Sequence, residues 1–221
     1  MLVFDFTVLE GGMSVELYKL RKWVGLQLGV LEHDLAIIPL AGDASFRRYF
    51  RVTLKSKKYV AVHAPPETEE NHSFVKIQQL LKHNDVRVPT IEAIDLEVGY
   101  FLLEDLGDSL LHNDLSDQKH FDEAFELIYS FIGLDISSFD LSEYGAGKIR
   151  TELDLFSEWF LENLLRLEVL DSDRVLIELV FQILINNALE QPQVFSHRDF
   201  HSRNIMCLKD SELAVIDFQD A

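Results

Sequence analysis

The feature that most constrains the fold is a change of sequence pattern near residue 107. Before this point the chain carries short apolar or alternating runs that are typical of strands, with one helical pattern among them. After it, longer runs carry apolar residues at helical spacing. Short apolar runs typical of strands return only from residue 194 onward. Strands followed by helices predict an α+β protein with two lobes.

The residue ranges of the predicted elements follow from these patterns. The predicted strands are 36–40, 46–54, 59–64, 91–96, 100–104, 194–195, 205–208 and 213–216. The predicted helices begin after Ser14 and run to about residue 28, then cover about 71–83, 117–135, 151–168 and 172–190, with a loop at 136–150. We predict an N-terminal extension at 1–12, a first lobe at 13–106 and a partial second lobe at 107–221, because Gly11-Gly12 separates the first segment from a new helical pattern.

Charge and composition exclude several classes of protein. The chain has 20 Lys and Arg against 38 Asp and Glu, a formal net charge of -18, and a nucleic-acid partner is not expected because it would require clustered cations. An anionic ligand would need a local cation or a metal ion. Cys207 is the single cysteine, so an intramolecular disulfide is impossible. No uninterrupted apolar run approaches the roughly 18 residues of a membrane span, so we expect a cytoplasmic protein with no membrane partner.

The segment Ser196–Asn204 and the pair Asp217-Phe218 carry the residues most suited to chemistry. Asp199 lies on a predicted loop five residues before Asn204, and a predicted hairpin brings Asp217 back beside Asn204. An amide oxygen and a carboxylate together suit a hard cation such as Mg²⁺. A nearby free carboxylate can accept a proton from an attacking hydroxyl. A metal ion, a base and fixed positions are what phosphoryl transfer requires.

The alternative interpretation is a polar loop followed by an ordinary hairpin with an exposed aspartate. It explains any one of these three residues well. It explains the complete ordered set poorly, because apolar strand runs stand at both places where the hairpin needs them, at 205–208 and 213–216.

The motif His197-x-Asp199-x-x-x-x-Asn204, followed by Asp217-Phe218, resembles the catalytic and metal motifs of the protein-kinase-like superfamily. The ending Asp217-Phe218-Gln219-Asp220-Ala221 is similar to the aminoglycoside phosphotransferase branch. Three further stretches resemble the bacterial cell-wall sugar kinases, which act on N-acetylmuramate and N-acetylglucosamine. They are LAGDASFRRY at 40–49, APPE at 64–67 and LLEDLG at 102–107, within a likeness that runs from about residue 13 to 221.

The resemblance implies a two-lobed kinase-like fold, with an antiparallel sheet and one helix in the first lobe and a mainly helical second lobe. It also implies ATP and Mg²⁺ as cofactors. Asp199 would orient or deprotonate the acceptor hydroxyl, and Asn204 and Asp217 would hold Mg²⁺. His197 would brace the loop structurally.

The resemblance also places the nucleotide along the first lobe. The turn containing Gly42 and Ser45 would lie over the phosphates and offer backbone N–H groups and a hydroxyl. The backbone of Glu104 to Leu106 would pair with the adenine edge.

One position departs from the protein-kinase pattern. In Val60-Ala61-Val62-His63, His63 stands where protein kinases place the phosphate-binding lysine, and a histidine is mostly neutral at pH 7. We expect Arg48 or Arg47 to supply the missing cation, against the alternative that both are solvated. The glutamates at 67, 69 and 70 are interpreted as a solvated acidic turn.

The predicted function is an ATP-dependent phosphotransferase for an amino sugar of cell-wall recycling, the partner being this small sugar. The alternatives are a non-catalytic nucleotide-binding remnant and an aminoglycoside or choline-type kinase. In the resembling families the chain continues beyond the position of Ala221, so we expect a fragment or a shortened gene, whose activity stays open. The apolar helices at 151–168 and 172–190 would then favour self-association.

Overall fold

A computed structural model gives the fold and describes residues 15–40, 46–113, 115, 118–209 and 212–221. The chain forms two compact units, one of residues 1–135 and 196–221 and the other of residues 136–195. The first unit holds both sheets, and the second holds a pair of helices. Each unit is described by itself below.

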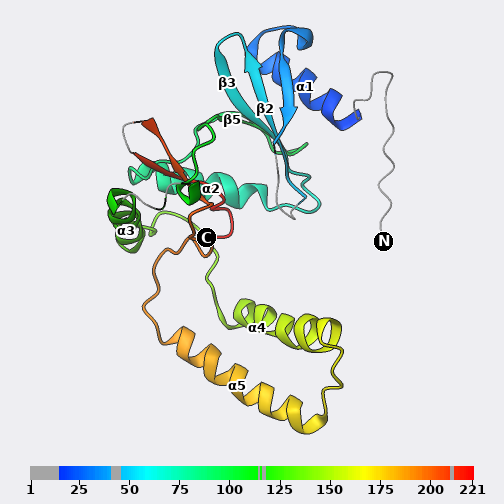
Figure 1. The fold of residues 1–221 in the computed structure, drawn as a ribbon, viewed down its shortest axis with the longest axis vertical. Coiled ribbons are helices and arrows are strands. Elements are labelled where there is room, and N and C mark those ends of the chain that lie inside the picture. The colour runs from blue at the N-terminus through cyan, green and yellow to red at the C-terminus, as the bar shows by residue number, and fades with distance from the viewer. Residues whose placement is uncertain (1–14, 41–45, 114, 116–117, 210–211) are drawn as a thin grey trace. The chain divides into compact units, whose positions relative to one another are not determined.

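A five-stranded antiparallel sheet in the order β1-β2-β3-β5-β4 organises the first unit (Figure 1). Its strands are β1 (Ala36–Pro39), β2 (Arg48–Leu54), β3 (Lys57–His63), β4 (Ile91–Asp95) and β5 (Tyr100–Glu104). β2 and β3 pair along their full length from Arg48↔His63 to Leu54↔Lys57. Lys55 has a φ of 57°, the left-handed conformation that a tight hairpin turn requires.

Alternation along the strands separates the two faces of this sheet. Helix α1 (Val15–Leu28) covers one face and buries Leu20 and Val24 against residues of β2, β3 and β5. Those partners are Val52, Ala61, Tyr100 and Leu102, with Phe50, Leu54 and Tyr59 packed around them. The intervening residues of the same strands point to the opposite face because side chains alternate along a strand.

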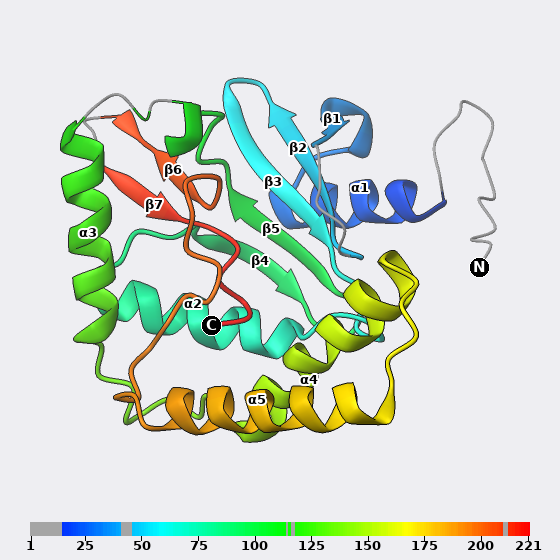
Figure 2. The same ribbon diagram turned by 60° about the horizontal axis from the view of Figure 1, so that its bottom comes forward.

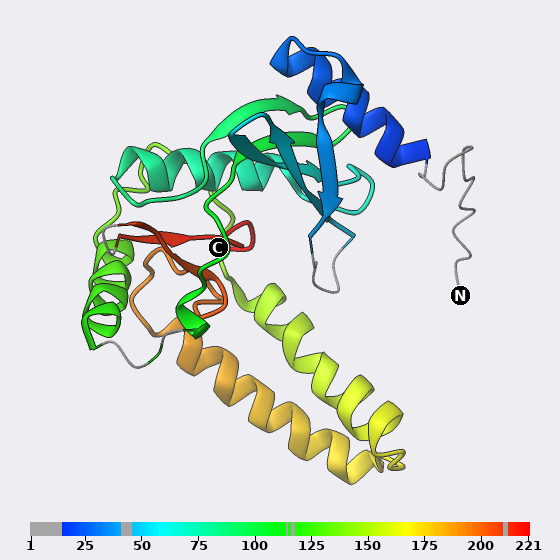
Figure 3. The same cartoon turned by 45° about the horizontal axis from the view of Figure 1, so that its top comes forward.

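Helix α2 (Asn71–His83) packs on that opposite face (Figure 3). The Phe74 ring meets Phe101 of β5 edge to face at 5.3 Å and stacks on Phe218 at 5.1 Å between centroids. At the start of the helix, the buried Asn71 side chain donates from Nδ2 to the carbonyl of Ala64 at 2.8 Å. This bond joins α2 to the end of β3.

A second, two-stranded sheet is formed by β6 (Ile205–Cys207) and β7 (Leu213–Val215). Figure 2 shows this hairpin between helix α3 (Gln118–Ile132) and the five-stranded sheet. The Val215 N–H donates to the Arg87 carbonyl at 2.8 Å, and Leu110 forms a bridge with Met206. The short 3₁₀ turns η1 (Glu32–Asp34) and η2 (Leu111–Asn113) complete this unit.

The second unit is a helical hairpin of α4 (Ala146–Leu155), the π-helical segment η3 (Phe156–Leu164) and α5 (Asp171–Leu189). Two ion pairs cross between its helices, Arg150 to Glu178 at 2.7 Å and Arg174 to Glu162 at 2.9 Å. Many large apolar side chains of α5 are exposed, including Val175, Leu176, Leu179 and Ile183. Self-association through such residues stays a prediction.

The element predictions are confirmed for most of the chain, with two exceptions. Residues 194–195 form no strand, and α4 begins at Ala146, inside the predicted loop. Two apolar residues in a row are too short a run to specify a strand without a partner. The predicted lobe boundary at 106/107 falls inside the first unit and stays a prediction. Within the described residues, no helix is long and apolar enough to cross a membrane.

We predict that Gly99→Ala destabilises the first unit strongly. Gly99 has a φ of 76°, and a Cβ atom there would lie 1.9 Å from the Ala64 carbonyl oxygen. Backbone strain alone costs about 1–3 kcal/mol, and the clash adds to it. Urea denaturation should show the loss, whereas Gly133→Ala, where the nearest atoms are 3.7 and 3.8 Å away, should shift stability by less than about 0.5 kcal/mol. Equal effects of the two substitutions would contradict this account.

Candidate functional site

A cavity of about 790 Å³ in the first unit lies between the five-stranded sheet and the β6–β7 hairpin. The sheet contributes Tyr49, Arg51, Val60 and Leu103, and the segment after β5 contributes residues 104–108. The hairpin side contributes Asn204, Met206 and the residues 216–219. Elements more than a hundred residues apart in sequence therefore face one cavity.

The structure brings both Asp199 and Asp217 next to Asn204, which lines this cavity. The Asn204 side chain is buried and donates from Nδ2 to Asp199 Oδ2 at 2.9 Å and to the Asp199 carbonyl at 3.0 Å. The Ile216 N–H donates to the Asn204 carbonyl at 3.0 Å, which places the following residue, Asp217, beside Asn204. Asn204 and Asp217 line the cavity, while the Asp199 side chain is 58% exposed.

Asp217 is held in an unusual backbone conformation. Its φ is 60°, in the left-handed region that aspartate tolerates better than most residues. Gln219 donates from Nε2 to Asp217 Oδ1 at 2.8 Å, and Ser73 of α2 donates from Oγ to the Gln219 carbonyl at 3.0 Å. Gln219 therefore fixes the Asp217 carboxylate. Gln219 stands where the D-F-G motif of protein kinases has glycine.

His197 is buried within the loop of residues 196–204, hereafter the 196–204 loop. Its ring is 2% exposed and contacts Phe131 and Phe200. The Nε2 atom lies 3.0 Å from the Ile216 carbonyl, which can only accept, so Nε2 carries the hydrogen. Burial lowers the pKa of His197, and the hydrogen bond to Ile216 opposes this only in part.

The donor atoms at this end of the cavity fit a hard divalent cation. Because Asn204 uses its amide N–H₂ group on Asp199, its oxygen Oδ1 is the atom that can face a cation beside the Asp217 carboxylate. Gln219 Oε1 is buried and has no hydrogen-bond partner among the described residues. Near Asp217 there is thus a buried acceptor for which the described residues supply no donor.

Glu104 anchors the segment that leaves β5. Its carboxylate forms a two-point ion pair with Arg87, with one distance of 2.9 Å, and accepts from the Thr90 N–H at 3.2 Å. The Arg87 guanidinium lowers the pKa of Glu104, against the opposing effect of partial burial. The Glu104 side chain thus holds the segment in place, while the predicted pairing of its backbone with adenine stays a prediction.

Arg51 of β2 fixes the same segment, and the sequence analysis did not identify this role. It donates to both carboxylate oxygens of Asp105, at 2.6 and 2.9 Å, and to the Gly107 carbonyl at 2.9 Å. A further bond of 2.7 Å reaches Asp108. Arginine suits this arrangement because its planar group donates at several points at once. Leu106, the other predicted adenine contact, lines the cavity in this segment.

The predicted phosphate turn lies outside the described residues, since Gly42 and Ser45 are both in 41–45. The structure places Arg48 and His63 away from the cavity, and their contact with the nucleotide stays a prediction. His63 packs edge to face on Tyr100 at 5.3 Å, within the face covered by α1, and Arg48 opposes it in the register. Neither lines the cavity, because strand alternation turns Val60, Tyr49 and Arg51 toward it instead.

Glu69 also departs from its prediction as part of a solvated turn. Its side chain is 12% exposed and pairs with the 4% exposed Arg47, with 2.8 Å between Nε and Oε2. Arg47 also lies over the Phe74 ring, at 5.5 Å from Cζ to the centroid. Arg47 and Glu69 are 22 positions apart in the sequence, and no spacing pattern links them.

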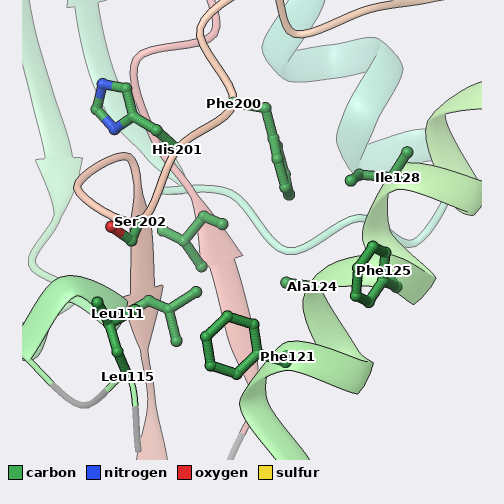
Figure 4. Close-up of a pocket in the computed structure, with 10 residues that line it drawn as sticks. Leu111, Leu115, Phe121, Ala124, Phe125, Ile128, Phe200, His201 and Ser202 are labelled. Atoms are coloured by element: carbon green, nitrogen blue, oxygen red, sulfur yellow. The ribbon is translucent and has the colours of Figure 1, made fainter. Parts of the chain in front are cut away.

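A second cavity of about 220 Å³ lies on the other side of the 196–204 loop (Figure 4). Its walls are mainly apolar side chains of α3 and η2, namely Phe121, Ala124, Phe125, Ile128 and Leu111. In Figure 4 the Phe200 ring extends toward α3, whereas the His201 ring points away from these apolar side chains. His201 Nε2 lies 3.4 Å from Asp199 Oδ1. The loop therefore packs through Phe200 and presents its polar groups elsewhere.

The antiparallel sheet, the anchored segment after β5 and the juxtaposed Asp199, Asn204 and Asp217 define the class of kinase-like phosphotransferases. Residues 36–221 match the model of the phosphotransferase enzyme family, abbreviated APH, and the chain belongs to this family.

Two curated relatives carry the name N-acetylmuramate/N-acetylglucosamine kinase. The one from Pseudomonas aeruginosa is 39% identical over 189 residues, covering 84% of this chain and 55% of the relative. The one from Pseudomonas putida is 37% identical over 220 residues, covering 94% of this chain and 64% of the relative. The chain thus spans less than two thirds of the length of these relatives.

Solved structures share the fold. A Plasmodium vivax ethanolamine kinase has a TM-score of 0.68 at 17% identity, covering 98% of this chain and 65% of the other. The streptomycin–ATP–APH(2″)-IIa ternary complex has a TM-score of 0.56 at 15% identity, covering 100% and 72%. At such identities the likeness shows a common fold and no more.

We predict that His197→Gln reduces the loss of stability at acidic pH. The lowered pKa keeps folded His197 neutral, whereas in the unfolded chain it titrates near 6.5. Below about pH 6.5 the unfolded state binds the proton first, so stability falls as pH falls. The free energy of unfolding in urea should therefore differ less between pH 7.5 and 5.5 in His197→Gln than in the wild type.

His33→Gln is the matched control for this measurement. Its side chain is 72% exposed, so its replacement should preserve the wild-type difference between the two pH values. If His197→Gln also preserved that difference in full, buried neutral His197 would not be the source.

Proposed function

We propose that this chain carries the ATP-binding and proton-accepting groups of a kinase that phosphorylates a hydroxyl of an amino sugar, N-acetylmuramate or N-acetylglucosamine. The observation that carries the proposal is the joining of Asp199, Asn204 and Asp217 by the bonds of the 196–204 loop and the β6–β7 hairpin. The family match and the names of the two relatives support the reaction and the acceptor.

Asp199 is the proposed base. Its carboxylate is well exposed, so an acceptor hydroxyl can reach it, and the bond from Asn204 fixes one of its oxygens. The acceptor oxygen forms a bond to the γ-phosphorus while its proton passes to Asp199. The bond between the γ-phosphorus and the oxygen shared with the β-phosphate breaks, and ADP leaves.

Asn204 and Asp217 are the proposed ligands of Mg²⁺. Bound there, the ion would neutralise charge on the phosphate oxygens. Gln219 keeps the Asp217 carboxylate in one orientation, and Asn204 links the metal side of the site to Asp199. Because Asn204 would both bind Mg²⁺ and hold Asp199, it would keep the base at a fixed distance from the phosphates.

The segment after β5 would receive the base of the nucleotide. Arg87 and Arg51 hold it from two sides through carboxylates at 104 and 105, so the backbone of Glu104 to Leu106 is kept in position. An ordered backbone edge loses little entropy on binding adenine. ATP is the proposed donor because the family resemblance pairs this backbone with the adenine edge.

We predict that Asp199→Ala lowers the rate of phosphoryl transfer about 10²- to 10⁴-fold and leaves Mg-ATP affinity within a few-fold of the wild type. Mass spectrometry of N-acetylmuramate and N-acetylglucosamine, incubated with the protein and Mg-ATP, measures the transfer. Calorimetry measures the binding. Asp34→Ala is the control, because this carboxylate is exposed and lies far from Asp199 in the sequence. It should change neither the transfer rate nor the Mg-ATP affinity.

The outcomes separate the remaining functions. Transfer by Asp199→Ala at the wild-type rate would remove Asp199 from the mechanism. Binding of Mg-ATP by the wild type without transfer to any amino sugar would favour the nucleotide-binding remnant. Transfer only to choline, ethanolamine or an aminoglycoside would replace the proposed acceptor.

A further inference from the structure

Two arginines line the larger cavity, and their charges are bound in different ways. Arg51 donates to the carboxylates of Asp105 and Asp108, so its charge is neutralised within the protein. Arg203 lines the cavity from the 196–204 loop, and its guanidinium has no carboxylate partner among the described residues. The Arg203 side chain is also exposed. It is therefore the arginine that the described walls of the cavity leave open to a ligand.

The backbone of Arg203 is held in place on both sides. The Arg203 N–H donates to His201 Nδ1 at 3.2 Å, and the Asn204 N–H donates to the His201 carbonyl at 2.9 Å. The Ser202 carbonyl accepts from the His112 N–H of η2, also at 2.9 Å. A side chain that starts from an ordered backbone loses less entropy when it binds a ligand.

The same contacts join Arg203 to the proposed base. Because His201 Nδ1 accepts from the Arg203 N–H, the hydrogen of the neutral ring is on Nε2. That Nε2 atom lies 3.4 Å from Asp199 Oδ1. Only the His201 ring therefore separates the Arg203 backbone from the carboxylate that an acceptor hydroxyl must reach. An arginine side chain is long enough to meet another group of an acceptor held at Asp199.

The charge of the chain makes such a cation necessary for an anionic acceptor. The formal net charge is -18, and Asp199 and Asp217 both add negative charge at this site. A field of this sign repels an anion unless a local cation or a metal ion offsets it. Mg²⁺ at Asn204 and Asp217 would offset the phosphates of ATP, whereas a negative group on the acceptor needs a cation of its own.

The two proposed acceptors differ in such a group. N-acetylmuramate is N-acetylglucosamine with a lactic acid joined to it through an ether, so it carries a carboxylate that N-acetylglucosamine lacks. A guanidinium can donate two parallel hydrogen bonds to a carboxylate and keeps its charge at physiological pH. N-acetylglucosamine offers no partner of this kind.

We propose that Arg203 binds the carboxylate of N-acetylmuramate and thereby favours this acceptor over N-acetylglucosamine. The guanidinium pairs with the lactic acid arm while the acceptor hydroxyl meets Asp199. The inference rests on the proposed function, because it names the group that one proposed acceptor presents to this chain.

Steady-state kinetics at saturating Mg-ATP tests the proposal with N-acetylmuramate, its uncharged methyl ester and N-acetylglucosamine. Arg203→Met removes the charge and should raise the KM for N-acetylmuramate about tenfold. The kcat should stay the same, because the lost interaction is equally strong before and during the transfer. The KM values for the two uncharged acceptors should not change. Arg203→Lys keeps the charge without the forked geometry and should fall between the wild type and Arg203→Met.

Lys57→Met is the matched control. It also removes one exposed positive charge from the first unit, and Lys57 does not line the cavity. All three KM values should stay at their wild-type levels in this variant. Thermal unfolding confirms that each variant is folded, and Arg203→Lys serves even if Arg203→Met is not.

The possible results separate this inference from the proposed function. An unchanged KM for N-acetylmuramate in Arg203→Met would overturn the inference. An equal rise for all three acceptors would do the same, because Arg203 would then act only through the loop. A rise in the KM for ATP would also overturn it, by assigning the guanidinium to the phosphates. Transfer by the wild type to none of the three acceptors would instead overturn the proposed function.

Discussion

One backbone hydrogen bond, from the Ile216 N–H to the Asn204 carbonyl, sets the geometry on which the site depends. It extends the short β6–β7 hairpin so that Asp217 lies beside Asn204, and the Asn204 amide then reaches back to Asp199. Phe218, fully buried against Phe74, and His197, bonded to the carbonyl of Ile216, hold the two sides of this bond. The polar groups are thus positioned by an apolar support.

The alternation of the five-stranded sheet decides which side chains can serve this site. One set of positions builds the core with α1, and the other set faces the cavity with α2. Two arginines are held by carboxylates here: Arg51 lines the cavity and fixes the segment after β5 through Asp105, and Arg47 pairs with Glu69 beside the Phe74 ring. Each is neutralised by a carboxylate, as expected for cations with little exposure to water.

The sequence predicted the hairpin and its three polar residues because their separations are short and apolar runs flank the turn. The predicted strand at 46–54 also implies that Arg47, Tyr49 and Arg51 share one face, because side chains alternate along a strand. The sequence could not predict the pairing of Arg47 with Glu69 or of Arg51 with Asp105, since these partners are distant in sequence and meet only when the sheet is assembled with the turn before α2 and with the segment after β5. His63 stands at the lysine position of the protein-kinase motif, whereas strand alternation sets it on the face opposite to Val60. The predicted strand at 194–195 does not form, because it has no partner strand.

A crystal structure with Mg²⁺ and a non-hydrolysable ATP analogue tests the central claim most directly. The account predicts a metal ion bound by Asn204 Oδ1 and the Asp217 carboxylate, with the phosphates of the analogue on that ion and Asp199 beside the terminal phosphate. An analogue bound elsewhere, or a metal ion held without Asn204 and Asp217, would contradict it.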